Sequence, residues 1–570
     1  MRNSEVASAL YEVADLLELK GVAFKPNAYR KAARSIEEMK LELSDFRKTS
    51  NLRDIPGVGE AIAKKVEELL DTGRLRYLDE LKEELPAGLL QLMDVPDIGP
   101  KTAMHLYKEL RVTNLDELRA AAASHQIRDL KGFGPKSEER ILQGIALLER
   151  RSGRMLLGQA YPIAEAIRAY LAGRAALELI SVGGSLRRMK ETIGDIDLLA
   201  GSDDPGAVMD VFASYPRAEE LLERGPTKAV LRLKDGTQVD LRVVAVKQYG
   251  AALQYFTGNK EHNVVLRSMA SERGMKLNEY GLFKKDTGEV VASEREEDIY
   301  EALGLRIMPP EMRENRGEIE ASRRGKLPRL VEMADIRGDF HAHTLASDGS
   351  ATIEEMAYAA KGKGYEYLGI TDHSQSLKVA NGLTVDRLRG NMDIARHISE
   401  RVEGVQVLIG AEVEVLGDGK LDYPDDVLEE LDYVIGAVHT KFSMGEREMT
   451  ERLLTALSNE RLTILAHPTG RVLEQREPYA FDMDRVMRAA KDNEVCLELN
   501  AFPERLDLSD VNCRRAKEGG VRVAIGTDSH SVAQLDYMLY GVATARRGWL
   551  EKRDVLNCLP LPDLVDFLSR

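Results

Sequence analysis

Two aspartates, Asp195 and Asp197, stand at the start of an apolar run that continues to Ala200. In a β-strand alternate side chains lie on the same face, so we expect both carboxylates to point the same way. Two like-charged carboxylates side by side repel each other unless a cation lies between them. This spacing therefore predicts a binding site for divalent cations.

A glycine turn lies just before these aspartates. The apolar run 177–182 predicts a buried strand, which breaks at Gly183-Gly184-Ser185 and is followed by Arg187 and Arg188. Glycines let backbone amides approach a bound anion, and the arginines add positive charge. Together with the aspartates, this turn favours a nucleotidyl-transfer site over a plain turn beside solvated carboxylates.

A third carboxylate is expected nearby. Residues 229–233 and 238–244 read as two strands joined by an Asp-Gly turn. Asp240 and Arg242 then share one face of the second strand. Three carboxylates can hold two divalent ions, one activating an attacking oxygen and one steadying the leaving phosphate.

An aromatic segment, Tyr255-Phe256-Thr257-Gly258, follows this hairpin. Such side chains can form a wall for a sugar or a base. Taken alone, two adjacent aromatic residues are more often part of a core.

Three glycine turns occur in the helical N-terminal region, at 55–59, 95–101 and 130–136. A Pro-Gly-x-Gly turn between helical patterns is typical of a helix-hairpin-helix, whose amides and helix N-terminus bind nucleic-acid phosphates. The repetition favours sequence-independent DNA binding over plain helix packing. The residues expected at the phosphates are Gly57, Gly59, Gly99, Lys101, Gly134 and Lys136.

The C-terminal region carries six of the ten histidines of the chain in short polar motifs. These motifs end seven apolar runs that alternate with helical patterns, which predicts a seven-stranded barrel with functional residues at its strand ends. Nitrogen and oxygen ligands without thiolate suit a cluster of Zn²⁺, Mn²⁺ or Fe ions. The expected ligands are His341, His343, Asp348, His373, Glu412, His439, His467, Asp528 and His530.

The composition limits the class of protein. The chain has 570 residues and a net charge of −15, which excludes a basic coat for nucleic acid but leaves local basic sites. Its three cysteines are far apart, which predicts a reducing compartment without disulfides. The sequence has no signal pattern and no apolar run of membrane length. We expect a cytoplasmic protein, monomeric, with no membrane partner.

Residues 1 to about 316 resemble the family X DNA polymerases, which include the vertebrate repair polymerase beta. The resemblance is carried by Gly184–Arg188, Gly194–Asp197, Val239–Arg242 and Tyr255–Gly258. It implies Mg²⁺ or Mn²⁺ on Asp195, Asp197 and Asp240, with gapped or nicked DNA and a deoxynucleoside triphosphate as partners. The implied nucleotide and DNA contacts are Gly184, Ser185, Arg188, Gly194, Arg242, Tyr255, Phe256, Gly258, Asn263 and Arg267.

The same family uses a lysine of its first hairpin region for lyase chemistry on a 5′-deoxyribose phosphate, and Lys65 matches that position. Phe24 replaces a histidine of the beta-type enzyme, and Lys260 replaces an acid. These departures affect the 5′-phosphate pocket and the nucleotide contacts. Lyase activity is one expectation, and a lysine that only contacts phosphate is the other.

Residues 335–570 resemble the polymerase-and-histidinol-phosphatase (PHP) domain, with all nine ligand positions filled. The combination of both modules is similar to bacterial and archaeal family X polymerases. It implies 3′→5′ exonuclease activity that favours Mn²⁺, and incision at abasic sites.

The expected fold is multidomain, α+β followed by α/β. Its parts are a helical DNA-binding domain at 1–85, a helical fingers-like domain at 86–150, a nucleotidyltransferase palm at 151–245, a thumb-like domain at 246–311, a linker at 312–334, and a distorted (β/α)7 barrel at 335–570. The leading hypothesis is a gap-filling repair polymerase with a nuclease. The alternatives are a DNA-binding scaffold with an inactive palm and a phosphoesterase for a small metabolite, and a template-independent polymerase.

Overall fold

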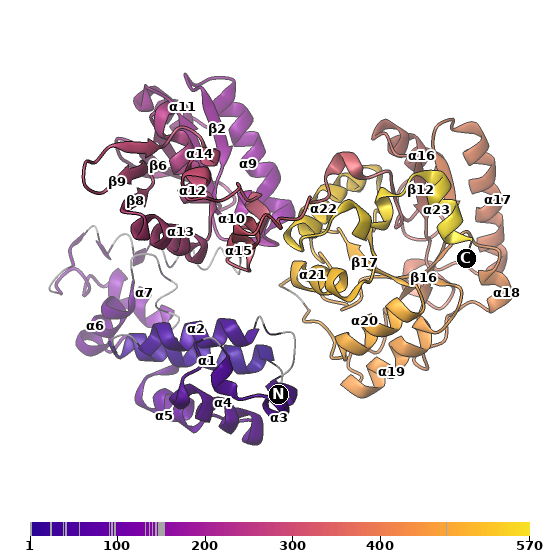
Figure 1. The fold of residues 1–570 in the computed structure, drawn as a ribbon, viewed down its shortest axis with the longest axis horizontal. Coiled ribbons are helices and arrows are strands. Elements are labelled where there is room, and N and C mark those ends of the chain that lie inside the picture. Colours follow the sequence, from indigo (N-terminus) through magenta and orange to yellow (C-terminus); the bar gives the residue numbers. More distant parts are fainter. Residues whose placement is uncertain are drawn as a thin grey trace. The chain divides into compact units, whose positions relative to one another are not determined.

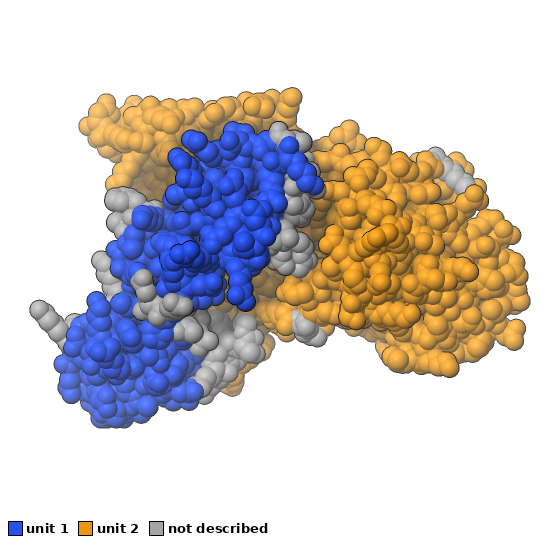
Figure 2. All heavy atoms as spheres, turned by 90° about the horizontal axis from the view of Figure 1, so that it is seen from below, with its two compact units in different colours: residues 1–152 blue, residues 153–570 orange. Residues whose placement is uncertain are grey.

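The structure is a computed structural model. It describes residues 3–22, 25–37, 39, 43–55, 57–89, 92, 95, 98–130, 133–135, 137–138, 141–142, 145, 154–474 and 476–569. The chain divides into two compact units, residues 1–152 and residues 153–570, coloured blue and orange in Figure 2.

The first unit is helical in the part that the structure describes. Val6, Leu10 and Val13 recur at helical spacing on its first helix and are buried against Ala32 and Ile36 of the second. Its helices are α1 (Asn3–Leu19), α2 (Lys25–Glu37), α3 (Leu43–Thr49), α4 (Glu60–Thr72), α5 (Arg76–Glu84), α6 (Pro100–Leu110) and α7 (Leu115–Ala123).

The second unit begins with a five-stranded sheet in the order β2-β4-β7-β6-β5, the expected palm. Figure 1 labels two of its strands, β2 and β6. Strands β4 and β7 run parallel, and the other neighbours are antiparallel. The strands are β2 (Leu179–Val182), β4 (Ile196–Gly201), β5 (Ala218–Arg224), β6 (Lys228–Leu233) and β7 (Gln238–Val244). With them lie α9 (Leu157–Ala172), α10 (Gly184–Arg187), α11 (Pro205–Ala213) and the short pair β1 (Met155–Leu156) and β3 (Thr192–Ile193).

The next part combines helices with a three-stranded sheet in the order β10-β9-β8. Its elements are α12 (Tyr249–Thr257), α13 (Lys260–Glu272), β8 (Met275–Asn278), β9 (Gly281–Lys284), β10 (Val290–Ala292) and α14 (Glu296–Ala302). The segment 312–334, expected as a linker, contains α15 (Glu318–Arg323). Arg313 and Glu318 in this segment are fully buried, and they pair with Glu296 and His262, respectively. Part of the segment expected as a linker is therefore packed against the rest of the unit.

The C-terminal part is a barrel of parallel strands (Figure 1). They are β11 (Gly338–Asp339), β12 (Tyr367–Ile370), β13 (Gln406–Ile409), β14 (Glu412–Glu414), β15 (Val434–Ala437), β16 (Leu462–Leu465), β17 (Cys496–Asn500) and β18 (Val523–Gly526). The third predicted run is split, since β13 ends before Gly410 and β14 starts after Ala411. A parallel bridge between Ala342 and Ser529 joins the first strand to the last. The predicted fold class is confirmed.

Helices surround these strands: α16 (Ile353–Gly362), α17 (Val385–Arg401), α18 (Asp425–Leu428), α19 (Glu446–Leu457), α20 (Met483–Asp492), α21 (Asp510–Gly519), α22 (Met538–Arg547) and α23 (Leu561–Leu568). The hydrophobic core of the palm extends into this part of the chain. Leu506 and Tyr540 belong to the same buried cluster as Leu157 and Leu198. The palm and the barrel therefore share packed side chains.

Candidate active sites in the palm and the barrel

Two of the palm carboxylates are neighbours across the sheet. Parallel pairing of β4 with β7 sets Asp197 directly beside Asp240, and Asp195 lies just before β4. Burial, together with the charges of Asp195 and Asp240, raises the pKa of Asp197 to about 7. Part of this shift is repulsion between the neighbouring carboxylates, and a bound cation would relieve it.

Two side chains that sequence reasoning missed hold Asp240. Gln238 Nε2 donates to Asp240 Oδ1 at 2.7 Å, and Lys228 Nζ lies 3.3 Å from Asp240 Oδ2. The signal for Gln238 was available, because it lies two residues before Asp240 on the same strand face. Lys228 comes from the neighbouring strand β6, and only the strand register brings it close.

The predicted glycine turn packs tightly against β4, the strand that carries Asp197. Gly183 N donates to the Asp197 carbonyl at 2.8 Å. Gly184 has a φ of 55°, and a Cβ there would lie 2.0 Å from Asp197 Oδ2. Only glycine fits this position, since a side chain would displace the Asp197 carboxylate.

A cavity of about 430 Å³ opens beside this turn, and we call it the Ser185 cavity. Its lining includes the predicted residues Ser185, Arg188, Gly194 and Asp195, and also Arg154, Lys190 and Thr192, which sequence reasoning missed. Three of its seven residues are basic, so the cavity suits an anion. The Arg188 side chain donates through Nε to Glu314 Oε1 at 2.9 Å and through Nη1 to the Thr257 carbonyl at 2.8 Å.

A second, smaller cavity of about 150 Å³ is lined by Asp197, Asp240, Lys228, Arg242 and Phe256, among others. The Arg242 guanidinium lies 4.8 Å from the centre of the Phe256 ring, and Tyr255 meets that ring edge-on. The structure thus brings the aromatic segment to the predicted carboxylates.

Asn263 closes the turn between α12 and α13. Its Nδ2 donates to the Tyr255 carbonyl at 2.7 Å and its Oδ1 accepts from Gln254 Nε2 at 2.8 Å. A Cβ on Gly258 would lie 2.7 Å from this oxygen, so Gly258 is required by close packing. Arg267 lies exposed on α13.

The three hairpin turns of the first unit share one backbone pattern. Val58 N donates to Ile55 O, Ile98 N to Val95 O, and Phe133 N to Leu130 O, each at 3.0 Å. Gly57 has a φ of 87° and packs against α2. The helix-starting glycines Gly59, Gly99 and Gly134 face open space, with no atom within 4 Å of a Cβ placed there. These openings leave room for a phosphate at each turn.

Lys65 lies on α4, with its Nζ 4.5 Å from the centre of the Tyr77 ring. Its neighbour Lys64 pairs with Glu60 at 3.1 Å. Three predicted features cannot be placed: Phe24 and Lys136 lie outside the described residues, and so does the side chain of Lys101.

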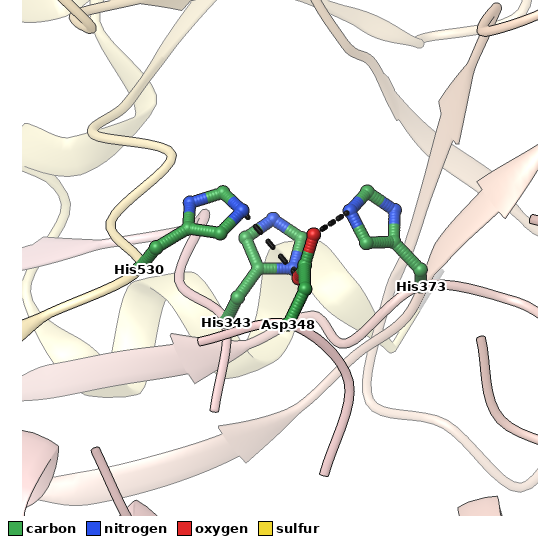
Figure 3. Close-up of side chains that lie close together, drawn as sticks. All are labelled: His343, Asp348, His373 and His530. Carbon is green, nitrogen blue, oxygen red and sulfur yellow. Dashed lines mark ion pairs between the residues drawn. The ribbon is translucent and has the colours of Figure 1, made fainter. Parts of the chain in front are cut away.

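At the barrel, the predicted ligands converge from different strand ends. Ligand atoms within 4.8 Å of one another form three groups: His343, Asp348, His373 and His530; His341, His343 and Asp528; and His373, Glu412 and His439. Figure 3 shows the first group, in which Asp348 lies 3.4 Å from His373 and 3.5 Å from His530. His467 belongs to none of these groups, but its Nε2 lies 3.0 Å from Glu412 Oε1.

We call the predicted ligands at the strand ends of the barrel the metal cup. Their chemistry fits a set of metal ions. His341 Nε2, His343 Nδ1 and Glu412 Oε2 are buried and have no hydrogen-bond partner. His373 Nδ1 lies 2.7 Å from Glu412 Oε2, yet the two atoms do not have hydrogen-bond geometry. Buried polar atoms are rarely left without partners, and cations shared by these nitrogens and oxygens would satisfy them. Among the described residues, the three metal-compatible groups all lie in the barrel.

The electrostatics of the ligands differ from one histidine to the next. Acidic neighbours outweigh burial and raise the pKa of His341, His373, His439 and His530, so cations that bind there would displace protons from these imidazoles. Burial and the neighbouring His373 lower the pKa of His343 to about 4, so this ligand is neutral at physiological pH. Burial opposes ionisation of Glu412, but His439 and His373 outweigh it and hold the pKa of this carboxyl well below its usual range. Neutral imidazoles and an ionised carboxylate are the forms that bind cations.

Residues behind the ligands orient them, and sequence reasoning missed them. Glu498 Oε1 lies 2.6 Å from His341 Nδ1, and Glu414 Oε2 lies 2.9 Å from His439 Nδ1. Asn500 Nδ2 donates to Asp528 Oδ2 at 3.0 Å. Glu414 alternates with Glu412 along β14, which was a usable signal. Glu498 is adjacent to His341 only through barrel closure.

Over its whole length the chain is 39% identical to a Bacillus subtilis protein described as "DNA polymerase/3'-5' exonuclease PolX", and the match covers 100% of both chains. The chain belongs to the family X DNA polymerases that carry a PHP domain. A model of the DNA polymerase beta thumb matches residues 252–314 of this family X chain, and the PHP model matches residues 339–501. Helix-hairpin-helix models match residues 1–75 and, as a SAM-like tandem, residues 89–146.

Other relatives match only part of this family X polymerase. A rat DNA polymerase lambda is 25% identical over 343 residues, 55% of this chain and 56% of its own length. A protein of Acetivibrio thermocellus described as a probable phosphatase is 35% identical over 202 residues, 34% of this chain and 78% of its own. Within the described part of the chain, the helices are too short or too polar to cross a bilayer.

Proposed function

We propose that this protein is a DNA-directed polymerase that fills short gaps during DNA repair of the base-excision type, and that its PHP domain removes nucleotides from 3′ ends. The observation that supports the polymerase activity is the register of β4 and β7. It sets Asp197 beside Asp240, with Asp195 adjacent. A binding scaffold with an inactive palm would have no use for carboxylates that repel one another. The full-length relative supports both activities.

In the palm, Asp195, Asp197 and Asp240 would hold Mg²⁺ or Mn²⁺. Such ions supply charge that activates a 3′-hydroxyl and stabilises the leaving pyrophosphate. The basic Ser185 cavity would take the triphosphate, with Ser185, Arg188 and the Gly184 and Gly194 backbone as contacts. Tyr255 and Phe256 would pack by the sugar, Arg242 would steady the aromatic ring, and Asn263 and Arg267 would face the base pair and the template.

The first unit would grip gapped or nicked DNA. Open space at Gly59, Gly99 and Gly134 supports phosphate binding at each hairpin, and Gly57 shapes the first one. Lys101 and Lys136 would add charge at the second and third. We propose that a 5′-phosphate beside the gap binds near Lys65.

Lyase chemistry at Lys65 would require its neutral amine to form a Schiff base with the opened sugar. Borohydride reduction on an incised abasic site would trap this adduct. The Lys65→Ala variant should then trap less, and undiminished trapping would assign the chemistry to another amine.

In the barrel, the nine ligands would hold Mn²⁺, Zn²⁺ or Fe ions. Ions in such a cup lower the pKa of a bound water and grip the phosphate that it attacks. Glu414 and Glu498 would keep the imidazoles oriented, and the metal cup would accept a 3′ terminus or a strand at an abasic site. The proposed substrate is a DNA phosphodiester, because the barrel belongs to the same chain as a DNA polymerase.

A second candidate for the barrel is a phosphoesterase acting on a small phosphorylated metabolite. The relatives described as probable phosphatases favour it, since each matches about a third of this chain. A phosphate monoester offered in place of DNA separates the two candidates.

The experiment that tests the proposal uses DNA with a one-nucleotide gap, labelled on the primer, with and without nucleotides, in Mg²⁺ and in Mn²⁺. Extension by one nucleotide supports the polymerase, and shortening in Mn²⁺ supports the exonuclease. Addition to single-stranded primer with the same efficiency would indicate a template-independent polymerase. No shortening under any metal, with hydrolysis of a monoester, would favour the phosphoesterase.

We also propose that the protein is a cytoplasmic monomer. Its three cysteines are buried and unpaired, as expected in a reducing compartment. Sedimentation equilibrium at micromolar concentration should give the mass of one chain, and a larger mass would contradict the monomer.

A further inference from the structure

The loop after α10 forms one wall of the Ser185 cavity. Arg188, Lys190, Thr192 and Gly194 all line this cavity. Met189 within the loop has a φ of 51°, a conformation that is uncommon and costly for a residue with a side chain. Such a loop keeps its shape only where other contacts hold it.

Two arginines of the barrel domain supply such contacts. At the end of α22, Arg547 donates through Nη1 to the Arg188 carbonyl at 2.8 Å, directly before the strained Met189. Arg471 donates through Nη2 to Glu191 Oε2 at 2.7 Å. The segment from Arg188 to Glu191 is therefore held at both ends by another domain of the same unit.

Arg547 also acts on the Arg188 side chain. Its Nη1 lies 3.1 Å from Glu314 Oε1, the same oxygen that accepts from Arg188 Nε at 2.9 Å. Asp510 fixes the other side of the Arg547 guanidinium, because its Oδ2 accepts from Nη2 at 2.7 Å. The Arg547 side chain is only 4% exposed, so water competes little for these bonds.

We propose that Arg547 of the PHP domain is a positioning residue for the polymerase. It holds the Arg188 carbonyl and shares Glu314 with the Arg188 guanidinium, so that Arg188 and Lys190 face the triphosphate of the incoming nucleotide. This inference rests on the proposed assignment of the Ser185 cavity to the triphosphate. The barrel is then a structural part of the nucleotide pocket in addition to carrying its own metal cup.

The test compares full-length variants in single-nucleotide gap filling with Mg²⁺. Arg547→Gln should raise the KM for the nucleotide about tenfold, the effect of one misplaced charge-assisted contact, and change kcat less. Arg547→Lys keeps the charge but reaches fewer partners, so it should restore part of the affinity. Exonuclease activity in Mn²⁺ should stay close to wild type in both variants, which reports that the barrel is folded.

The matched control is Arg546→Gln on the same helix. Arg546 pairs with Glu311 at 2.7 Å and donates to the Val331 carbonyl at 3.0 Å, and neither partner belongs to the Ser185 cavity. This variant should lower the melting temperature and leave the nucleotide KM unchanged.

The outcomes separate the inference from its premise. If Arg188→Ala raises the nucleotide KM while Arg547→Gln behaves like Arg546→Gln, the positioning role is overturned and Arg547 only stabilises the domain contact. If Arg188→Ala itself leaves the KM unchanged, the assignment of the Ser185 cavity to the triphosphate fails. If Arg547→Gln does not fold, the nucleotide KM of Arg547→Lys decides whether Arg547 has the positioning role.

Discussion

In the palm, Asp240 is held by Gln238 on one oxygen and by Lys228 on the other. Asp240→Asn keeps the shape of the side chain and removes its charge. We expect primer extension to fall at least about a hundredfold, because the cations lose a charged ligand. Binding of gapped DNA, measured by fluorescence anisotropy, should persist, since the hairpins lie in the other unit.

Asp235→Asn is the control for that variant, because Asp235 lies in the turn between β6 and β7, where it accepts from Thr237 N and from Arg217 Nη2 and contacts none of the three predicted ligands. It should extend primers normally. Extension by Asp240→Asn at the wild-type rate would show that the third ligand is a different residue.

At the barrel, Glu498 orients the ligand His341 from behind. Glu498→Gln should lower metal affinity or exonuclease rate by about 10–100-fold, the usual effect of removing the partner of a metal-bound imidazole. Elemental analysis of the purified protein and primer shortening in Mn²⁺ measure the two quantities. Glu494→Gln, an exposed change just before the same strand, is the control. Equal metal content and rate in both variants would contradict this role for Glu498.

Residue types at strand ends were predictable from the sequence because strand periodicity and ligand chemistry act locally. Asp195 and Asp197 near the start of β4 and most of the barrel residues fall under this rule, whereas Asp348 lies in a turn well after β11. Lys228, Glu498 and Glu314 were not predictable in the same way. Their partners are distant in the sequence, and only sheet register, barrel closure or domain packing brings them together.

At the scale of elements, buried ion pairs of Glu296 join α10 to α14. Glu296 accepts from Arg187 Nη1 and Nη2 at 2.9 and 2.7 Å and from Arg313 Nη1 at 2.5 Å. Burial opposes ionisation of Glu296, but Arg313 and Arg187 outweigh it and lower its pKa to about 2. The helices are thus joined by one ionised carboxylate between two arginines.

Glu296→Gln should destabilise the protein by about 3–5 kcal/mol, because it leaves buried arginine charge without a partner. Glu297→Gln, a change to a half-exposed neighbour on α14, should have little effect. Urea unfolding at pH 7 measures both changes. Equal midpoints for the two variants would show that these ion pairs are not stabilising.

The buried Glu296 carboxylate makes the free energy of unfolding depend on pH. Its folded pKa of about 2 lies below the ordinary value of 4.5, so its stabilising effect is complete above about pH 4.5 and is lost as the pH falls toward 2. The shift corresponds to about 3 kcal/mol. The difference in unfolding free energy between wild type and Glu296→Gln should shrink over this interval, and a constant difference would contradict the shift.

The hairpins predict how the first unit selects DNA. A 5′-phosphate on the downstream strand should tighten binding to a short gap, and Lys65→Ala should weaken that preference by about tenfold, the loss of one charge-assisted contact. Lys64→Ala is the control, because Lys64 is exposed and pairs with Glu60. Anisotropy titrations with phosphorylated and unphosphorylated gaps measure the preference. An unchanged preference in Lys65→Ala would place the phosphate elsewhere.

The sequence predicted well which segments are helices and which are strands. It did not predict the exact first and last residue of each. The seven apolar runs form the barrel, but the third breaks at Gly410 and Ala411, a detail that depends on the neighbouring strands. The charge-rich segment 312–334 predicted a linker by composition. Some of its charges pair with buried groups, as Arg313 does with Glu296, and composition carries no information on such pairing.

At the scale of the whole molecule, the central claim is that two independent metal sites in one chain build and shorten DNA. The palm carboxylates and the barrel ligands belong to separate strands of separate sheets. Each site should therefore fail alone when its own ligands are removed.

The most direct measurement uses one labelled primer on gapped DNA in Mn²⁺ with two full-length variants. Asp195→Ala should lose extension and keep shortening, whereas His341→Ala combined with His343→Ala should lose shortening and keep gap filling. Shortening that survives in the double histidine variant at the wild-type rate would contradict the account, because the nuclease would then lie outside the barrel cup.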